Sequence, residues 1–164
     1  MLTINRRSFI IRHLRELFFI CAVPMLKIYW FLFRPYRPGA KTFIFYEDKL
    51  LLARLGYGHK SWVLPGGGME RGETHLETAI RETKEEVGIT LREPVFIGEQ
   101  SNTRQFKKIT VFYYIAHVCS EDLIIDVQEI KDAAWFTLDS LPPDARDYLK
   151  QEIEMLKKWD IKQL

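Results

Sequence analysis

Three glutamates on one short stretch, Glu82, Glu85 and Glu86, are the residues of this chain best suited to chemistry. On a helix their i, i+3, i+4 spacing gathers three negative charges, which costs a few tenths of a kcal/mol (order of magnitude) on an exposed face. Arg81 can pair with Glu85 and Glu77, but it leaves Glu82 and Glu86 unmatched. Mg²⁺ takes oxygen ligands and is usually shared between carboxylates and substrate phosphates. The cluster therefore indicates a metal site, and the alternative is an ordinary solvated helix face.

A glycine run before the glutamates weakens that alternative. Gly66–Gly68 follow Pro65, and glycine lets the backbone approach a ligand where a Cβ would clash. Thr74 and Glu77 predict a capping box at the start of the helix, and Gly88 predicts a left-handed stop at its end. Residues at three- and four-residue spacing predict one core-facing stripe, made of Leu76, Ala79, Ile80, Thr83 and Val87. The three glutamates are expected on a different face.

These residues resemble the Nudix box, the signature of the Nudix hydrolase family, which reads G-x5-E-x7-R-E-U-x-E-E-x-G-U. The matching positions are Gly67, Glu73, Arg81-Glu82, Glu85-Glu86 and Gly88-Ile89. One position departs from the pattern, because Thr83 stands where a bulky aliphatic side chain is preferred. The box is long and its spacing is rigid, so it is far more specific than a lone glycine motif. The wider resemblance covers roughly residues 39–142 by pattern and leaves out the N-terminal segment.

The resemblance implies a single α/β domain over residues 39–164, with a mixed β-sheet sandwiched between helices. It also implies hydrolysis of a nucleoside diphosphate linked to another moiety, by metal-activated water with Mg²⁺ or Mn²⁺. Two alternatives stay open: a catalytically inactive Nudix-fold regulator that binds nucleotides, and a membrane-surface adaptor. The leaving group cannot be named from the sequence, because its contacts come from loops without a readable code.

The resemblance and the chemistry together assign roles to the box residues. Glu82 and Glu86 are the expected direct metal ligands, Glu85 is a ligand or a close partner, and the carbonyl of Gly66 completes the set. Glu82 is the first choice for the general base, with Glu85 as a reserve. Arg81 is expected to orient its carboxylate neighbours rather than to touch the substrate.

Substrate contacts outside the glutamates are expected from loops and strand ends. Candidates for phosphate or substrate contact are Arg54, His59, Lys60, Gly67 and Gly68. A further acid or base is expected from Glu99 or Glu129, and Glu129 is also a reserve general base. The polar, basic stretch 102–108 is interpreted as a hairpin tip that either overhangs the site or is simply solvated.

The remaining elements follow from periodicity. Expected strands cover residues 41–46, 50–54, 62–64, 94–100, 109–118 and 129–136. Pro38-Gly39 is interpreted as a boundary. A closing helix is expected to start near residues 141–144, with an apolar stripe of Ala145, Tyr148, Leu149, Ile153 and Leu156.

The first 38 residues form a segment of a different kind, both basic and apolar. Their 3.6-residue period predicts a long helix kinked at Pro24. Three interpretations compete: packing on the domain or on a second copy as a homodimer, lying on a membrane surface, and spanning the bilayer. Aromatic residues beside Arg34 and Arg37 favour a membrane surface over spanning.

Composition sets broader limits. The net charge of +2 is too small to predict a nucleic-acid partner, so the expected partner is a nucleotide-type small molecule. Cys21 and Cys119 share no metal or redox spacing, which fits a reducing compartment. The expected location is the cytoplasm, with the protein peripheral to the membrane if residues 1–38 bind lipid.

Overall fold

The computed structural model describes residues 22, 24–26, 29, 31–32, 35–56, 61–104, 106–145 and 147–159. The chain divides into two compact units. The N-terminal unit comprises Met1–Arg37 together with Asn102–Ile109, and the main unit comprises Pro38–Ser101 together with Thr110–Leu164. The metal-site candidates of the sequence all belong to the main unit.

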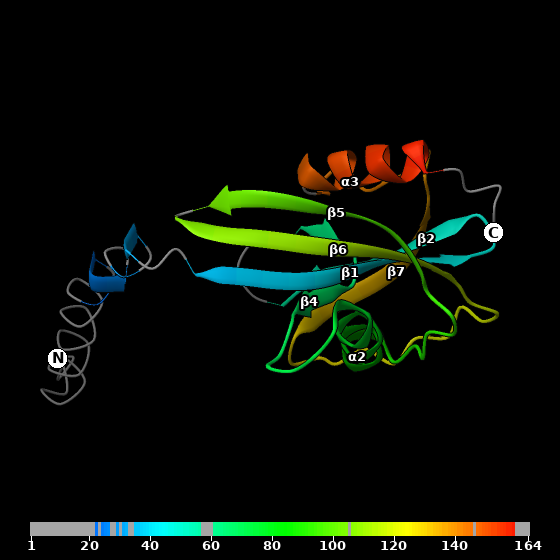
Figure 1. Cartoon of the computed structure of the whole chain (residues 1–164). Helices are drawn as coiled ribbons and strands as arrows, with labels where there is room; N and C mark the ends of the chain where they lie inside the picture. The colour runs from blue at the N-terminus through cyan, green and yellow to red at the C-terminus, as the bar shows by residue number, and fades with distance from the viewer. Residues whose placement is uncertain are drawn as a thin grey trace, which may run out of the picture. The chain divides into compact units, whose positions relative to one another are not determined.

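One sheet forms the framework (Figure 1). Its strands are β1 (Tyr36–Tyr46), β2 (Lys49–Leu55), β3 (Trp62–Val63), β4 (Gly66–Gly68), β5 (Val95–Arg104), β6 (Lys107–His117) and β7 (Ile130–Thr137). The order is β3-β2-β1-β6-β5, with β4 paired to β1 and β7 paired to β2. β2 pairs with β1, β3 and β7 antiparallel, as β4 does with β1.

The central pair β1 and β6 runs parallel. The Lys108 N–H donates to the Pro35 carbonyl at 3.2 Å, and the Val118 N–H donates to the Phe45 carbonyl at 2.8 Å. Residue numbers therefore rise together along the two strands, which is the parallel arrangement. The predicted mixed sheet is confirmed.

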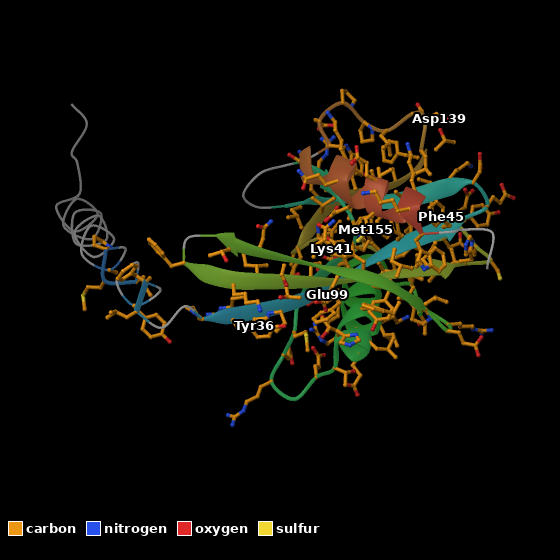
Figure 2. All side chains as sticks on the ribbon, turned by 45° about the horizontal axis from the view of Figure 1, so that its top comes forward. Tyr36, Lys41, Phe45, Glu99, Asp139 and Met155 are labelled. Carbon is orange, nitrogen blue, oxygen red and sulfur yellow. The ribbon has the colours of Figure 1, made fainter. Side chains whose placement is uncertain are left out.

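Helices cover both faces of the sheet (Figure 1). α3 (Asp147–Lys158) packs Leu149, Ile153 and Leu156 on one face, and this layer includes Phe45 of β1, with Met155 of α3 against it (Figure 2). α2 (His75–Val87) packs on the opposite face, where Val87 joins Ile44 and Leu51. Tyr148 belongs to the predicted stripe, but its side chain lies outside the described residues.

Four strands, β1, β2, β5 and β6, are longer than their patterns predicted. β1 starts at Tyr36, so Pro38-Gly39 lies inside a strand. The two compact units nevertheless divide between Arg37 and Pro38, next to the predicted boundary. A Cβ on Gly39 would stand 2.6 Å from the Gly67 carbonyl oxygen, so this glycine allows β4 to approach β1. β5 and β6 likewise extend into the expected tip and leave a short turn around Phe106. α3 starts after Pro142 and Pro143, later than predicted.

Local signals set the ends of α2 as predicted. Thr74 Oγ1 accepts from the Glu77 N–H, Glu77 Oε2 accepts from the Thr74 N–H, and Gly88 adopts a left-handed φ of 76°. The predicted stripe is only partly right, since Leu76 is 39% exposed while Thr78 is buried. Leu76 lies in the first turn, outside the core clusters of the described residues.

Gly88→Val should destabilise the protein more than Thr74→Ala does. A Cβ at Gly88 would meet Ile124 Cβ at 2.6 Å and the Ile124 carbonyl oxygen at 2.9 Å, and the φ is positive. Strain of this kind costs about 1–3 kcal/mol before the clash is counted, whereas loss of the cap costs about 1 kcal/mol. Thermal melts of both variants check this order, and an unchanged melting temperature for Gly88→Val would contradict it.

Of the first 34 residues, the structure describes residues 22, 24–26, 29 and 31–32, and these are helical. Most of the long N-terminal helix expected from the sequence, including any kink it has, lies outside the described residues. Within the described part of the chain, we find no helix with the length and apolar character needed to cross a bilayer.

Candidate functional site

The glycine run lies between β1 and α2, and two of its glycines are required by close packing. In β4, Gly66 pairs with Lys41 and Gly67 with Ala40. A Cβ on Gly66 (φ 138°) would stand 2.2 Å from the Ala40 carbonyl oxygen, and one on Gly67 would stand 2.5 Å from Glu82 Cδ. The absence of side chains therefore brings the loop backbone directly against a carboxylate of α2.

Arg81 is the centre of an ion-pair network. Its guanidinium donates to both oxygens of Glu73 at 2.6 and 3.0 Å, to Glu82 Oε1 at 3.0 Å and to Glu85 Oε2 at 3.0 Å. It also donates to the Gly68 carbonyl at 3.1 Å. These anions, Glu73 first, raise the pKa of Arg81. The network joins the glycine loop to the helix through one rigid planar donor.

Two predictions about Arg81 are corrected by this geometry. Arg81 does reach Glu82, which the sequence left unmatched, because neighbouring side chains can converge when one is as long as arginine. Glu77 is not one of its partners among the described contacts, since its carboxylate bonds to Thr74 in the capping box.

Glu86 was predicted on a separate face with the other glutamates, but it is buried, with 5% exposure. Its Oε2 accepts from the Gly66 N–H at 2.8 Å. Burial raises the pKa of Glu86 to about 7, with the charges of Glu82 and Glu129 adding to the rise. Burial also raises the pKa of Glu82 against the opposing effect of Arg81. Two partly desolvated carboxylates thus face the glycine loop, while Glu85 is exposed.

Glu73 should support acid stability. Its bonds to Arg81 hold its pKa at about 2, below the ordinary value of 4.5. A lowered carboxylate pKa contributes stability that is present above pH 4.5 and is lost as pH falls from 4.5 to 2. Glu73→Gln should therefore lower the urea midpoint at neutral pH and flatten its fall in that window. Glu121→Gln, an exposed carboxylate outside the network, is the control, and equal acid profiles for Glu73→Gln and wild type would contradict the assignment.

Downstream candidates separate in space. Glu129 raises the pKa of both Glu82 and Glu86, so its charge acts on the pair. Glu99 lies exposed on β5 (Figure 2). The charges that chiefly shift the pKa of Glu82 and Glu86 belong to other residues, Glu129 among them. Of the two acids left open by the sequence, Glu129 is the one that the fold couples to the glutamates.

Of the basic residues predicted to contact phosphate, the structure describes Arg54. Arg54 donates to Asp144 Oδ2 at 2.9 Å, and its guanidinium carbon lies 4.6 Å from the Trp62 ring centroid. Its described partners are thus Asp144 and Trp62, and its contact with phosphate stays a prediction. His59 and Lys60 lie outside the described residues.

Lys41 was missed as a site residue. It lies opposite Gly66 in the strand pairing, and its charge lowers the pKa of Glu86. Its Nζ donates at 2.7 Å to Glu152 Oε1, which also accepts from the Tyr113 hydroxyl at 3.0 Å. A lone lysine at the start of a predicted strand gave no signal, because its carboxylate partner is 111 residues away.

This chain resembles known proteins in sequence and in fold. The family model for the NUDIX domain matches residues 35–158. The chain belongs to the NUDIX domain family. The resemblance found in the box is therefore confirmed for most of the chain, and the glycine loop, Arg81 network and carboxylate pair described above are parts of a NUDIX domain.

Among the relatives is the NAD-capped RNA hydrolase NudC of Pseudomonas aeruginosa, 33% identical over 102 residues, which make up 58% of this chain and 34% of that protein. An asymmetrical bis(5'-nucleosyl)-tetraphosphatase of Rattus norvegicus is 35% identical over 96 residues, 56% of this chain and 65% of that protein. The chain thus matches about a third of the NudC relative's length. A MutT NUDIX hydrolase from Burkholderia pseudomallei shares the fold, with a TM-score of 0.67 at 23% identity over 74% of this chain and 98% of that one.

The residues present in this NUDIX domain fit a hard divalent cation. Among the described residues, no group of three or more acidic, histidine or cysteine side chains is arranged to hold a metal ion. However, Mg²⁺ commonly takes only one or two carboxylates and keeps several waters. Glu82 and Glu86 supply two hard oxygen donors whose charge is costly where they lie, as the raised pKa of each indicates. A bound cation would offset that cost.

Proposed function

We propose that this protein is a divalent-metal-dependent hydrolase that cleaves the phosphoanhydride of a nucleoside diphosphate linked to another moiety. One observation carries the proposal: a complete set of box carboxylates in which Glu82 and Glu86 are partly desolvated against a glycine loop. The named activities of the relatives, on NAD-capped RNA and on bis(5'-nucleosyl) tetraphosphate, agree with it. We also propose a cytoplasmic location, where nucleotide substrates are made.

Each residue of the site has a proposed task. Glu82 and Glu86 hold the cation with the Gly66 carbonyl, and Glu85 stands beside them on the exposed side. When bound, Mg²⁺ or Mn²⁺ supplies charge neutralisation for the phosphate oxygens and lowers the pKa of water. Arg81 holds Glu82 and Glu85 in place through its planar donors.

Proton transfer is assigned to a glutamate. Glu82 accepts the proton of the attacking water, because Arg81 holds its carboxylate in place against the backbone of the glycine loop. Glu129 is the reserve, since it is exposed to solvent and coupled to the pair. Gly67 and Gly68 leave the loop backbone open to the diphosphate, and Gly68 has no atom within 4 Å of where a Cβ would stand.

A nucleotide panel tests the function. NAD, ADP-ribose, a dinucleoside tetraphosphate, a nucleoside triphosphate and a sugar nucleotide are incubated with the protein and Mg²⁺ or Mn²⁺, and the products are separated by chromatography. At least one should be cleaved between phosphates, and a chelator should abolish cleavage. Binding by calorimetry without cleavage of any member would favour the inactive regulator instead. Products labelled from ¹⁸O-water would show which phosphorus atom is attacked.

A further inference from the structure

The N-terminal unit and the main unit differ sharply in charge. Met1–Arg37 and Asn102–Ile109 together hold ten lysines and arginines against one acidic residue, a formal charge of +9. Because the whole chain carries +2, the main unit carries −7. The small net charge of the whole chain is therefore the sum of a strongly basic unit and an acidic unit. A basic charge of this density attracts an anionic surface.

The same unit also exposes large apolar side chains. Of the twelve exposed large hydrophobic residues in the described part of the chain, seven lie in this unit. They include Met25 at 70%, Leu32 at 66% and Phe31 at 53% exposure. Each such side chain gains about 1.5–3 kcal/mol on leaving water. Basic and apolar side chains therefore occur together, which is the composition of a membrane-interface element.

The β5–β6 turn contributes to the same basic and apolar set of side chains in the N-terminal unit. The rings of Phe31 and Phe106 meet edge to face, with centroids 5.2 Å apart. The Lys108 N–H donates to the Pro35 carbonyl at 3.2 Å, and Lys108 Nζ lies 5.9 Å from the Tyr36 ring centroid. Phe106 occupies a left-handed position, φ 65°, which a large aromatic residue rarely adopts. The turn thus presents an exposed phenyl ring beside two lysines, Lys107 and Lys108.

We propose that the N-terminal unit binds the surface of anionic phospholipid membranes, with Lys107 and Lys108 on the headgroups and Met25, Leu26, Phe31, Leu32 and Phe106 at the acyl boundary. The β5–β6 turn is part of this surface, so the membrane-binding element is not confined to residues 1–38. The proposal goes beyond the proposed function and does not depend on it.

The chemistry of these side chains favours a lipid surface over two other partners, single-stranded RNA and a second copy of the unit. Single-stranded RNA rewards aromatic side chains by stacking, but it offers nothing comparable to Met25, Leu26 and Leu32. A second copy of the unit would bring two charges of +9 together, which opposes association. An anionic bilayer satisfies both the charge and the aliphatic side chains.

The test is flotation of the full chain with two kinds of vesicle, phosphatidylcholine alone and phosphatidylcholine mixed with phosphatidylserine. Wild type should float with the mixed vesicles only, and less at high salt. Lys107→Glu/Lys108→Glu should weaken binding on the order of 30-fold or more, because each basic residue near the surface contributes about fivefold. Phe106→Gly, which suits the left-handed turn, should weaken binding about tenfold or more.

Matched controls keep the result interpretable. Lys150→Glu/Lys157→Glu changes the same charge on exposed positions of α3, outside the unit, and Val127→Ser removes an apolar side chain that is 85% exposed in the main unit. Both should float as wild type does, and thermal melts should show that every variant is folded.

Failure of wild type to float, or equal binding by all variants, overturns the proposal. Loss of RNA gel-shift binding in the Lys107/Lys108 variant without vesicle binding by wild type assigns the surface to RNA. A dimer dissociated by Phe106→Gly, again without vesicle binding, assigns it to self-association.

Discussion

Glu86→Gln should lower turnover sharply and, without metal, make the protein more stable. Removing a group of this kind lowers turnover by about a hundredfold or more, and Glu82→Gln should do the same. The stability effect has a separate origin. Glu86 is buried, and its pKa rises from 4.5 to about 7 in the fold. The folded state therefore holds a proton that the unfolded chain has released in this range.

The sign of the effect follows from linkage. A carboxylate with a raised folded pKa contributes stability below pH 4.5 that is lost as pH rises through 7. Above pH 7 the buried negative charge costs on the order of 3 kcal/mol. Glutamine carries no charge and its carbonyl can still accept from the Gly66 N–H, so the variant should melt higher than wild type above pH 7 in the presence of a chelator.

Bound metal should reverse the order of the two melting temperatures, so that wild type melts higher than Glu86→Gln. Mg²⁺ binding to the folded state stabilises it by mass action, so wild type should gain melting temperature with Mg²⁺ while Glu86→Gln gains little. Calorimetric melts with chelator and with Mg²⁺ check this, and Glu154→Gln on the exposed side of α3 is the control. Wild-type rates in both the Glu82 and Glu86 variants would remove these residues from catalysis. An unchanged or lower melting temperature for Glu86→Gln without metal would show that its charge is already compensated.

Gly67→Ala should lower activity by about a hundredfold while leaving the protein folded. The added methyl group would stand 2.5 Å from the carboxylate carbon of Glu82. That carboxylate is the end of a flexible side chain, so it swings away at modest cost to stability. A misplacement of about 1 Å at a reacting group can cost about a hundredfold in rate, and Arg81 loses its bond to Glu82 when the carboxylate moves.

The neighbouring glycines supply matched controls for stability. Gly66→Ala places its Cβ 2.2 Å from the Ala40 carbonyl oxygen at φ 138°, so it should unfold or strongly destabilise the sheet. Gly68→Ala meets nothing within 4 Å and should melt as wild type does. Steady-state rates and melts of the three variants would separate the effects. Full activity of Gly67→Ala would mean that Glu82 need not occupy this position.

The α2 framework was readable from the sequence because its causes are local. Thr74 and Glu77 are three residues apart, and Gly88 ends the helix by its own backbone freedom. The spacing of the box carboxylates is equally local, so the family and the fold class followed from one stretch of about 25 residues. The mixed sheet followed from the resemblance, since no local pattern specifies that β1 and β6 are parallel partners.

What only the tertiary structure decided is the environment of each charge. Helical spacing gives the direction of a side chain, but not what covers it, so the burial of Glu86 and its raised pKa depended on how α2 packs on the sheet. The pairing of Lys41 with Glu152 and the action of Glu129 on the carboxylates likewise join residues far apart in sequence. The turn at Phe106 joins Phe31 for the same reason. The sequence determined which groups this protein carries, and packing over long chain separations decided which of them meet and how strongly water screens them.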